Sequence, residues 1–338
     1  MTGRHSDQAA EGDNLVKATA RAYAIQGLVK YHGLKNKKQR IPYHDSISVC
    51  MKSLPTITTV EFSETFKHDK YRINGKAPSK NEQDRIRVVL DSLRNLARRK
   101  SLHARVESRN PPVKGKGLGY SSSGFAALGL ASATSLGMSF TPKMLSQIVR
   151  LGAGSASRSL VGGFSIWYAN RNGLSYAEQL AKENEIPWRS IIVPVESTIK
   201  TDKAHEDAVL SPFYKPRLSY LKNLLPKMKT AIIRGDTRQI SRLAEVDTLN
   251  LHAVTMTGKA GLVLFSPLSI HVMEEVLRLR EEDDVPVWFS LDTGPSVFVN
   301  TLPNESSKVA RRVGKVTDRN VLVSPVGGPA ELLEKHLF

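Results

Sequence analysis

The N-terminal part of the chain has the hydrophobic pattern of β structure. The clearest signal is Thr56 to Phe62 (TITTVEF), where β-branched residues alternate with polar ones as along a half-buried strand. The pair Asn74-Gly75 is of the type that closes a tight hairpin. We therefore expect a hairpin at this pair and strands at 16–25, 27–31, 47–51 and 56–62.

Helical periodicity appears in the next segment. From Asp84 to Ala97, apolar residues recur at the spacing of an amphipathic helix, which ends at the basic cluster 98–100. Ser121-Ser122-Ser123 opens an alanine-rich run and predicts the start of another helix. We also expect a strand at 104–108, a Pro/Gly/Lys loop at 111–119 and a helix at 141–151.

The second half mixes both patterns without strict βαβ alternation, which favours the α+β class. A chain of 338 residues is long enough for two lobes, so we expect a disordered tail (1–14), an N-terminal lobe (15–190) and a C-terminal lobe (191–338). The expected strands are 164–168, 191–195, 261–265, 287–290 and 321–323; the expected helices are 205–229, 237–256, 270–280 and a short one at the end, with a loop and helix region at 170–187.

Composition narrows the function classes. The net charge of +17 favours an anionic partner: nucleic acid, anionic lipid or a phosphorylated metabolite. Cys50 is the only cysteine, which excludes an intrachain disulfide and favours a buried thiol. Residues 1–14 lack the apolar core of a signal peptide, and 121–140 is too rich in Ser, Gly and Ala for a membrane span, so we expect a cytoplasmic protein without a membrane segment.

Four segments contain residues suited to chemistry, each with an ordinary structural alternative. The glycine-rich stretch 115–131 is suited to phosphate binding at a helix start, or to plain close packing. Arg158 lies among small residues that would let a carboxylate or phosphate approach, or it pairs with an acid between the lobes. Asp292 follows an apolar strand and either lies in a site or caps a turn. Lys30 either points inward to pair with an Asp or reaches the surface.

Other signals are weak. His205 and His252 lie on helical patterns without a third ligand at suitable spacing, so no metal site is predicted. Ser122 and Ser123 lack the context of a hydrolase nucleophile.

Taken in order, these segments resemble the mevalonate diphosphate decarboxylase branch of the GHMP kinase superfamily. The family's phosphate loop reads approximately GLASSASGFAAL, against GLGYSSSGFAAL from Gly117. Its arginine segment reads approximately GSGSACRSLYGGF, against GAGSASRSLVGGF from Gly152, and its acid segment approximately FDAGPN, against LDTGPS from Leu291. The helical stretch 245–253 is also similar, and the likeness runs from about Lys17 to Ala330. It implies a GHMP kinase-like two-lobed fold, with a ribosomal protein S5 domain 2-like N-terminal lobe and an α/β-sandwich C-terminal lobe.

The resemblance also implies roles for individual residues. Arg158 would hold the C1 carboxylate, and Asp292 would lie near the C3 oxygen, kept ionised by Lys30. Leu34 and His32 replace a Lys and a Trp of the diphosphate-handling enzymes, and the chain looks closest to the archaeal subgroup. The implied substrate contacts are Tyr31, Ser155, Ser157, Lys203 and His205, and the implied phosphate-binding residues are Gly119, Ser121, Ser122 and Ser123.

The source of the leaving phosphate is the open question. Tyr120 replaces the first loop serine and could fill nucleotide space, and Lys114-Gly115-Lys116 adds charge. Both favour decarboxylation of mevalonate 3,5-bisphosphate to isopentenyl phosphate without ATP or another cofactor. The alternative is an ATP- and Mg-dependent phosphomevalonate or diphosphomevalonate decarboxylase.

Two hypotheses from other classes remain: a kinase of the same superfamily and a basic nucleic-acid-binding protein. Lys30, Arg158 and Asp292 together disfavour the kinase, and the chain lacks a recognised nucleic-acid-binding motif. The resemblance further implies a homodimer that binds a small phosphorylated substrate.

Overall fold

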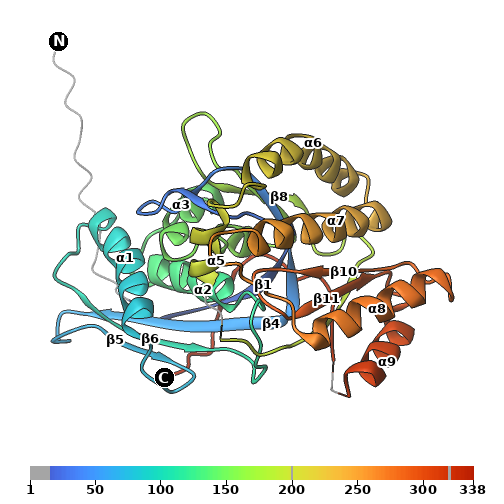
Figure 1. The fold of residues 1–338 in the computed structure, drawn as a ribbon. Helices are drawn as coiled ribbons and strands as arrows, with labels where there is room; N and C mark the ends of the chain where they lie inside the picture. The colour runs from blue at the N-terminus through green and yellow to red at the C-terminus, as the bar shows by residue number, and fades with distance from the viewer. Residues whose placement is uncertain (1–15, 199–200, 319–320) are drawn as a thin grey trace, which may run out of the picture.

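The computed structural model describes residues 16–198, 201–318 and 321–338, which form two antiparallel-rich sheets and their covering helices (Figure 1). The expected tail, 1–14, lies outside the described residues. The fold is mixed α and β, as the sequence pattern predicts. No helix in the described part of the chain is long and apolar enough to cross a membrane.

The first sheet is built around two long neighbouring strands. β1 (Ala18–Val29) pairs antiparallel with β4 (Ser46–Ser63), and the order continues as β13-β1-β4-β6-β5, with β7 pairing β4 and β8 pairing β7. The other strands are β5 (Lys70–Ile73), β6 (His103–Arg109), β7 (Phe164–Trp167), β8 (Ala177–Ala181) and β13 (Glu331–Leu333). A two-stranded ribbon, β2 (Leu34–Asn36) with β3 (Ile41–Pro42), lies beside this sheet.

Helices cover the first sheet because their apolar faces pack on it. Alanines and leucines of α2 (Tyr120–Ser135) share one core cluster with β1, β4 and β6, and the same cluster contains residues of the other three helices. These are α1 (Lys80–Leu96), α3 (Pro142–Gly152) and α4 (Ala156–Val161). α1 begins with a capping box between Ser79 and Glu82, a standard helix start.

The second sheet has the order β10-β11-β9-β12 and helices on both faces. Its strands are β9 (Arg189–Val193), β10 (Val287–Leu291), β11 (Val297–Thr301) and β12 (Leu322–Ser324). α8 (Pro267–Glu281) and α9 (Ser306–Thr317) share a core cluster with β9, β10 and β11. α6 (Tyr214–Ile233) and α7 (Thr237–Met256) belong to a larger cluster that also contains residues of β1, β4 and β7, so one core joins the two sheets.

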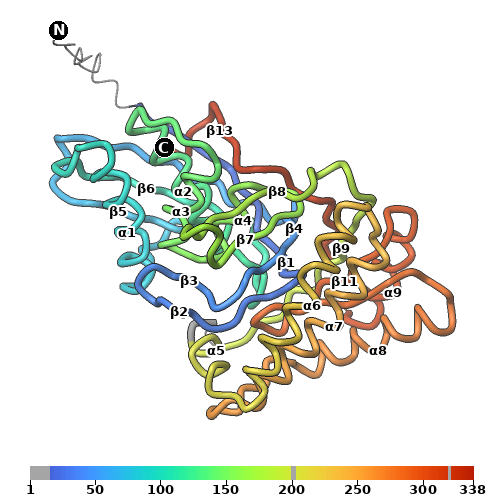
Figure 2. The backbone as a smooth tube through the Cα atoms, turned by 90° about the horizontal axis from the view of Figure 1, so that it is seen from above, coloured from blue at the N-terminus to red at the C-terminus, as the bar shows by residue number. Residues whose placement is uncertain are grey.

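The chain end returns to the first sheet, as the view from above shows (Figure 2). β13 pairs antiparallel with β1 through Thr19 and Leu333. The sequence predicted a short helix here, which is wrong: these residues form a strand at the free edge of β1. The lobe boundary expected between residues 190 and 191 falls inside β9.

The structure corrects several other boundaries. The runs expected at 16–25 and 27–31 form one strand, Ala18–Val29, and 47–62 belong to one strand of 18 residues. Asn74-Gly75 makes a tight turn with both φ angles positive, and Ile73 and Lys76 exchange backbone hydrogen bonds across it as an isolated antiparallel bridge. The hairpin goes no further: the chain leads into α1, and β5 pairs in parallel with β6. The loop-and-helix region 170–187 contains β8, and 261–265 contains no strand.

Several elements were missed and one helix was merged with another. The sequence pattern predicted no strand for β2, β3, β5 or the buried β11, and no helix for α9, which is formed by a run rich in basic residues, or for α4, which lies in the small-residue segment around Arg158. The helix expected at 205–229 is interrupted: α5 (Thr201–Ala208) ends before α6 begins at Tyr214. The helix expected at 237–256 is confirmed at both ends as α7.

Candidate active site

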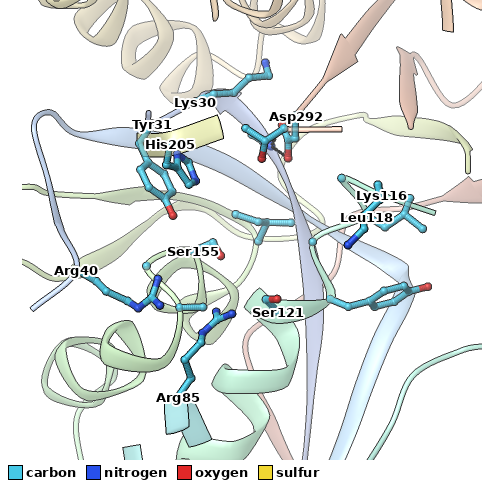
Figure 3. A pocket seen from close by; sticks show the side chains of 18 of the residues that line it. Lys30, Tyr31, Arg40, Arg85, Lys116, Leu118, Ser121, Ser155, His205 and Asp292 are labelled. Atoms are coloured by element: carbon cyan, nitrogen blue, oxygen red, sulfur yellow. Dashed lines mark hydrogen bonds between the residues drawn. The ribbon is translucent and has the colours of Figure 1, made fainter. Parts of the chain in front are cut away.

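A cavity of about 770 Å³ lies where the two sheets meet. It is lined by the end of β1, the loop before α2, the start of α4, α5 and the turn after β10 (Figure 3). Asp292 and His205 lie towards one end of it, and Arg40 and Arg85 towards the other. Among the described lining residues six are cationic and two acidic: Lys30, Arg40, Lys80, Arg85, Lys116 and Arg158 against Glu82 and Asp292. The cavity therefore suits a ligand with several negative charges.

Asp292 is held at the end of β10 by the backbone of β1. Its two oxygens accept from the Gly27 N–H at 3.0 and 3.1 Å. A side chain at position 27 would start 2.9 Å from Asp292 Oδ1, so glycine permits this approach. Burial raises the pKa of Asp292, while Lys30 and the Gly27 hydrogen bond act to lower it. The carboxylate points into the cavity as a base would.

Arg158 is a buried cation that forms no ion pair with a carboxylate of the described residues. Its Nε donates to Ser48 Oγ at 2.9 Å and an Nη donates to Ser46, both neutral acceptors. The guanidinium carbon also lies 5.7 Å from the Tyr31 ring and 5.6 Å from the Trp167 ring. Burial lowers the pKa of Arg158 to about 10.

Among the described residues no carboxylate forms an ion pair with Arg158, which does not support the alternative of a local acid as its partner; the charge of Asp292 acts on the pKa of Arg158 through space. A buried charge left unpaired is costly. Arg158 is therefore poised to bind an incoming anion.

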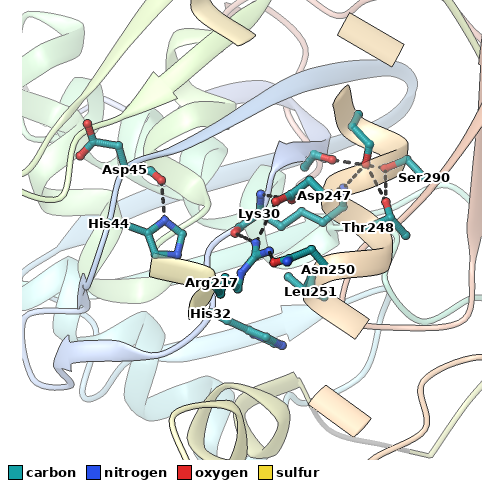
Figure 4. Close-up of polar contacts among 12 residues, drawn as sticks. Lys30, His32, His44, Asp45, Arg217, Asp247, Thr248, Asn250, Leu251 and Ser290 are labelled. Carbon is teal, nitrogen blue, oxygen red and sulfur yellow. Dashed lines mark hydrogen bonds and ion pairs between the residues drawn. The ribbon is translucent and has the colours of Figure 1, made fainter. Parts of the chain in front are cut away.

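Lys30 points inward, as one interpretation of the sequence predicted, but its ion-pair partner is Asp247 and not Asp292. Its Nζ lies 3.8 Å from Asp247 Oδ2 and donates to the Ala244 carbonyl at 3.2 Å, and the side chain points away from Asp292 in Figure 3. Asp247 also pairs with Arg217 at 3.0 Å, both fully buried (Figure 4). Burial lowers the pKa of Lys30, and the charges of Asp247 and Asp292 raise it.

The pairing of Lys30 with Asp247 was missed from the sequence. Asp247 lies within 245–253, the stretch that was noted as similar to the family, and this similarity was the available signal. No local pattern pointed to Arg217, which lies on α6 and donates to the Lys30 carbonyl at 2.7 Å. Lys30 is thus held in a buried cluster with Asp247 and Arg217. From there its charge acts to lower the pKa of Asp292 through space.

The glycine-rich loop brings the first turn of α2 to the cavity. Gly119 has φ of +78°, and a side chain there would start 2.7 Å from the Ile25 carbonyl oxygen. Gly119 and Ser121 line the cavity. Ser122 and Ser123 are buried instead: Ser122 donates to the Gly119 carbonyl at 2.6 Å, and Ser123 shares a hydrogen bond of 2.7 Å with Thr56. Both anchor the helix start to β1 and β4, so Ser121 is the serine of the three that can reach a ligand.

Some of the expected substrate contacts also line the cavity, and others do not. Tyr31, Ser155 and His205 line the cavity. Ser157 is buried and donates to the Gly154 carbonyl at 2.7 Å, which gives it a structural role in the turn before α4. Lys203 is exposed on α5 and is absent from the described lining of the cavity.

Tyr120 borders the main cavity and a smaller one of about 130 Å³. Its hydroxyl donates to the Val113 carbonyl at 3.3 Å, and its ring packs on the large core cluster. The smaller cavity is lined by apolar side chains such as Ile86 and Phe125 together with polar and charged ones such as Arg72 and Asn110. Space for a further ligand group therefore exists beside the loop even with the phenol present.

The described residues contain no group of three His, Cys, Asp or Glu side chains placed to hold a metal ion. Mg²⁺ is commonly bound through substrate phosphates with one or two protein oxygens. Ser121 and Asp292 are among the oxygen-bearing side chains of the cavity that could supplement such phosphates here.

Comparisons with known proteins agree with this geometry. Residues 22–177 match the diphosphomevalonate decarboxylase-like N-terminal domain. The chain is 40% identical over 324 residues to the phosphomevalonate decarboxylase of Haloferax volcanii, covering 95% of this chain and 98% of that one. It is 25% identical to the mevalonate 3,5-bisphosphate decarboxylase of Thermoplasma acidophilum, over 83% and 69% of the two chains.

A solved structure shows the same fold. The Enterococcus faecalis mevalonate diphosphate decarboxylase, whose description names mevalonate diphosphate-mediated ATP binding, superposes with a TM-score of 0.87 at 27% identity, over 94% of this chain and 99% of that one. The chain thus belongs to the mevalonate diphosphate decarboxylase branch of the GHMP kinase superfamily, and it is a decarboxylase of the mevalonate pathway.

Proposed function

We propose that this decarboxylase acts on mevalonate 5-phosphate, with ATP as phosphoryl donor, and releases isopentenyl phosphate, CO2, phosphate and ADP. A substrate with a carboxylate is supported by Arg158. Its buried guanidinium donates to hydroxyl groups, and no carboxylate of the described residues forms an ion pair with it. A planar guanidinium matches a carboxylate in a bidentate pair. The substrate's C1 carboxylate would supply the missing charge.

Asp292 supports a reaction at C3. With the C1 carboxylate on Arg158, the Asp292 oxygens would accept the proton of the C3 hydroxyl as that oxygen takes a phosphoryl group. The electron pair of the C1–C2 bond then forms the C2=C3 double bond, the C3–O bond breaks, and CO2 and phosphate leave. Lys30 stabilises the ionised form of Asp292, although burial opposes it. A general base of this kind contributes about 10²- to 10⁴-fold to a rate.

The choice of a phosphoryl donor rests on two supports. The relative that is 40% identical over nearly its whole length is named for phosphomevalonate, whereas the one named for the bisphosphate is 25% identical. The smaller cavity beside the first turn of α2, with both apolar and polar lining residues, offers room for a nucleotide base next to the phosphate loop. ATP, with Mg²⁺ on its phosphates, would supply the phosphoryl group that turns the C3 hydroxyl into a leaving group.

The second candidate is decarboxylation of mevalonate 3,5-bisphosphate without ATP. It is favoured by Lys116, which lines the cavity beside the phosphate loop, and by Tyr120 at the border of the smaller cavity. In this case the C3 phosphate is already present, so no proton needs to leave a hydroxyl.

Decarboxylation assays separate the two candidates. Purified protein is incubated with mevalonate 5-phosphate with and without ATP and Mg²⁺, and with mevalonate 3,5-bisphosphate alone, and CO2 and isopentenyl phosphate are measured. We expect CO2 from the 5-phosphate only when ATP is present. CO2 from the bisphosphate, with none from the 5-phosphate plus ATP, would instead establish the second candidate.

Asp292→Asn sharpens the test. If Asp292 serves phosphorylation, the variant loses activity on mevalonate 5-phosphate with ATP but retains turnover of any bisphosphate that the wild type accepts. Equal loss on both substrates would contradict the role of Asp292 as the base for phosphoryl transfer.

A further inference from the structure

A chain of hydrogen bonds runs from α7 through a buried histidine to the edge of the cavity. Thr255 Oγ1 donates to the Leu251 carbonyl at 3.0 Å and lies 2.9 Å from His32 Nε2. His32 Nδ1 in turn lies 2.9 Å from His205 Nδ1. His32 and Thr255 are fully buried, whereas His205 lines the cavity.

The direction of each bond follows from the number of protons. The Thr255 hydroxyl has one proton, and it is donated to Leu251, so its oxygen accepts from His32 Nε2–H. A neutral imidazole carries a proton on one nitrogen only, so His32 Nδ1 is an acceptor. His205 must then donate to it from Nδ1–H.

Burial keeps His32 neutral, and so preserves these hydrogen-bond directions along the chain of hydrogen bonds from Thr255 through His32 to His205. The pKa of His32 is held well below its ordinary value, first by burial and then by the neighbouring His205 and Arg217. Neutral His32 therefore remains an acceptor at Nδ1. The neutral His205 ring carries its proton at Nδ1, which makes Nε2 its acceptor nitrogen.

The His205 ring is also fixed in orientation. It stacks on Tyr31 with centroids 4.7 Å apart and planes inclined by 12°, and it meets His32 edge-on at 4.9 Å. The same Tyr31 ring lies 5.7 Å from the Arg158 guanidinium carbon. His205 is therefore one ring away from the proposed carboxylate site.

We propose that His32 and Thr255 are positioning residues, which hold His205 as its Nδ1–H tautomer and so direct Nε2 to the phosphate ester at the non-reacting end of the substrate. This inference rests on the proposed phosphorylated substrate. A phosphate monoester has a second pKa near 6, so the ester and Nε2 share one proton in a charge-assisted hydrogen bond. The proton lies on the phosphate or on Nε2, and the Nδ1–H bond to His32 is retained in both cases.

Two carboxylates on α5, close to His205 in the sequence, have partners of their own. Glu206, on the same helix, pairs with Lys37 at 2.8 Å, and the Asp207 carboxylate accepts from the Ala260 N–H. The groups whose charges act on the pKa of His32 are His205, Arg217, His252 and His44. Other charged groups on α5 and around the cavity are Lys203, Glu206, Asp207 and Arg158.

Steady-state kinetics with mevalonate 5-phosphate test the inference. His205→Ala is expected to raise KM about 10- to 100-fold, the effect of losing a hydrogen bond to a charged group, with kcat changed less than about threefold. Thr255→Val, which cannot accept from His32, should raise KM in the same direction, and Thr255→Ser should restore it.

Two matched controls separate positioning from general damage. Thr317 makes the same hydrogen bond to the carbonyl four residues earlier, at 3.0 Å on α9, so Thr317→Val reports the cost of losing such a bond far from the cavity. His271 is exposed on α8, so His271→Ala controls for loss of a histidine. Both are expected to keep the wild-type KM.

Histidine ¹⁵N chemical shifts provide a readout that a structural role would not move. The His205 signals, assigned by their loss in His205→Gln, should show the Nδ1–H tautomer in the wild type and a tautomer mixture in Thr255→Val. A wild-type Nε2–H tautomer, or an unchanged KM in His205→Ala with an active wild type, would overturn the inference. An inactive wild type would instead reject the proposed function, so the two failures are distinguishable.

Discussion

Lys30 and Asp247 form an ion pair in the interior of the protein, with Lys30 Nζ 3.8 Å from Asp247 Oδ2. The Lys30 N–H also donates to this carboxylate at 2.9 Å, so both the backbone and the side chain at the end of β1 depend on one residue of α7. Arg217 pairs with the other oxygen at 3.0 Å. One carboxylate thus neutralises two buried cations beside the active site.

Asp247→Asn is expected to lower the free energy of unfolding by about 3–5 kcal/mol, because it leaves the charges of Lys30 and Arg217 buried without compensation. Urea denaturation measures the change. Glu178→Gln, which breaks an exposed pair with Arg171, should cost only about 0–1 kcal/mol. Equal costs for the two variants would show that the buried cluster does not stabilise the fold.

Asp292→Asn is expected to separate stability from activity. Burial raises the pKa of Asp292, so its contribution to stability is fully present below the ordinary pKa of about 3.9 and is lost as pH rises through the raised value. At pH 7 the variant should therefore be more stable than the wild type, and the difference should shrink on acidification.

Thermal unfolding of both proteins across this pH range checks the sign. Decarboxylation of mevalonate 5-phosphate by the variant at pH 7 should fall about 10²- to 10⁴-fold. A variant that is less stable than the wild type at pH 7 would show that the Gly27 contact and the nearby cations outweigh the cost of burying the carboxylate.

Two histidines with lowered pKa values, the half-buried His44 and the buried His252, predict acid lability. Burial lowers the pKa of His44 to about 4 and that of His252 to about 3. Because these pKa values lie below the ordinary 6.5, each histidine contributes stability that is present above pH 6.5 and lost as pH falls towards its folded value. In this pH window each histidine should lower the free energy of unfolding by about 1.4 kcal/mol for each pH unit of acidification.

His44→Asn tests the slope while keeping the local hydrogen bond. His44 Nδ1 donates to the Asp45 carbonyl at 2.7 Å, and the Asn amide can replace that donor (Figure 4). Urea denaturation between pH 6.5 and 4 should show a shallower loss of stability than in the wild type. The exposed control His271→Asn should leave the slope unchanged; a similar change in both variants would contradict the effect of burial.

The sequence predicted those parts of the site that depend on local pattern. Asp292 follows a strand and the glycine-rich loop opens a helix, and the order of such segments identified the family before any contact was known. The relation of Lys30 to Asp247 could not be predicted in this way, because 217 residues separate the two and the pairing depends on how α7 packs on β1. The long strands were divided for a related reason: β1 stays paired with β4 across register shifts between Tyr23 and Ile25 and between Gly27 and Val29, and the hydrophobic periodicity of one strand does not record its partner.

Ser122, Ser123 and Ser157 show the limit of reasoning from motifs. Each lies in a segment that resembles a phosphate- or substrate-binding motif, yet the structure buries all three and engages their hydroxyls with backbone or side-chain oxygens. A serine at a helix start has two possible roles, binding a ligand or fixing the turn. Which role it takes depends on the direction of its side chain, which changes by about 100° with each residue along a helix.

Gly119→Ala tests whether the loop must lie against β1. An alanine there meets two penalties: a positive φ of +78°, costing about 1–2 kcal/mol, and a Cβ only 2.7 Å from the Ile25 carbonyl oxygen. Gly137 also has a positive φ, of +69°, but a Cβ added there would have no atom of the described residues within 4 Å, so Gly137→Ala carries the first penalty alone.

We expect Gly137→Ala to lose about 1–2 kcal/mol of stability with unchanged kcat/KM. In Gly119→Ala the loop must move away from β1 and carry the first turn of α2 with it, and a displacement of about 1 Å at a site costs on the order of 10²-fold in rate. Its kcat/KM for mevalonate 5-phosphate should therefore fall at least tenfold, even in conditions where the protein is fully folded. Wild-type kinetics in Gly119→Ala would mean that the contact with Ile25 fixes the fold without positioning the phosphate loop.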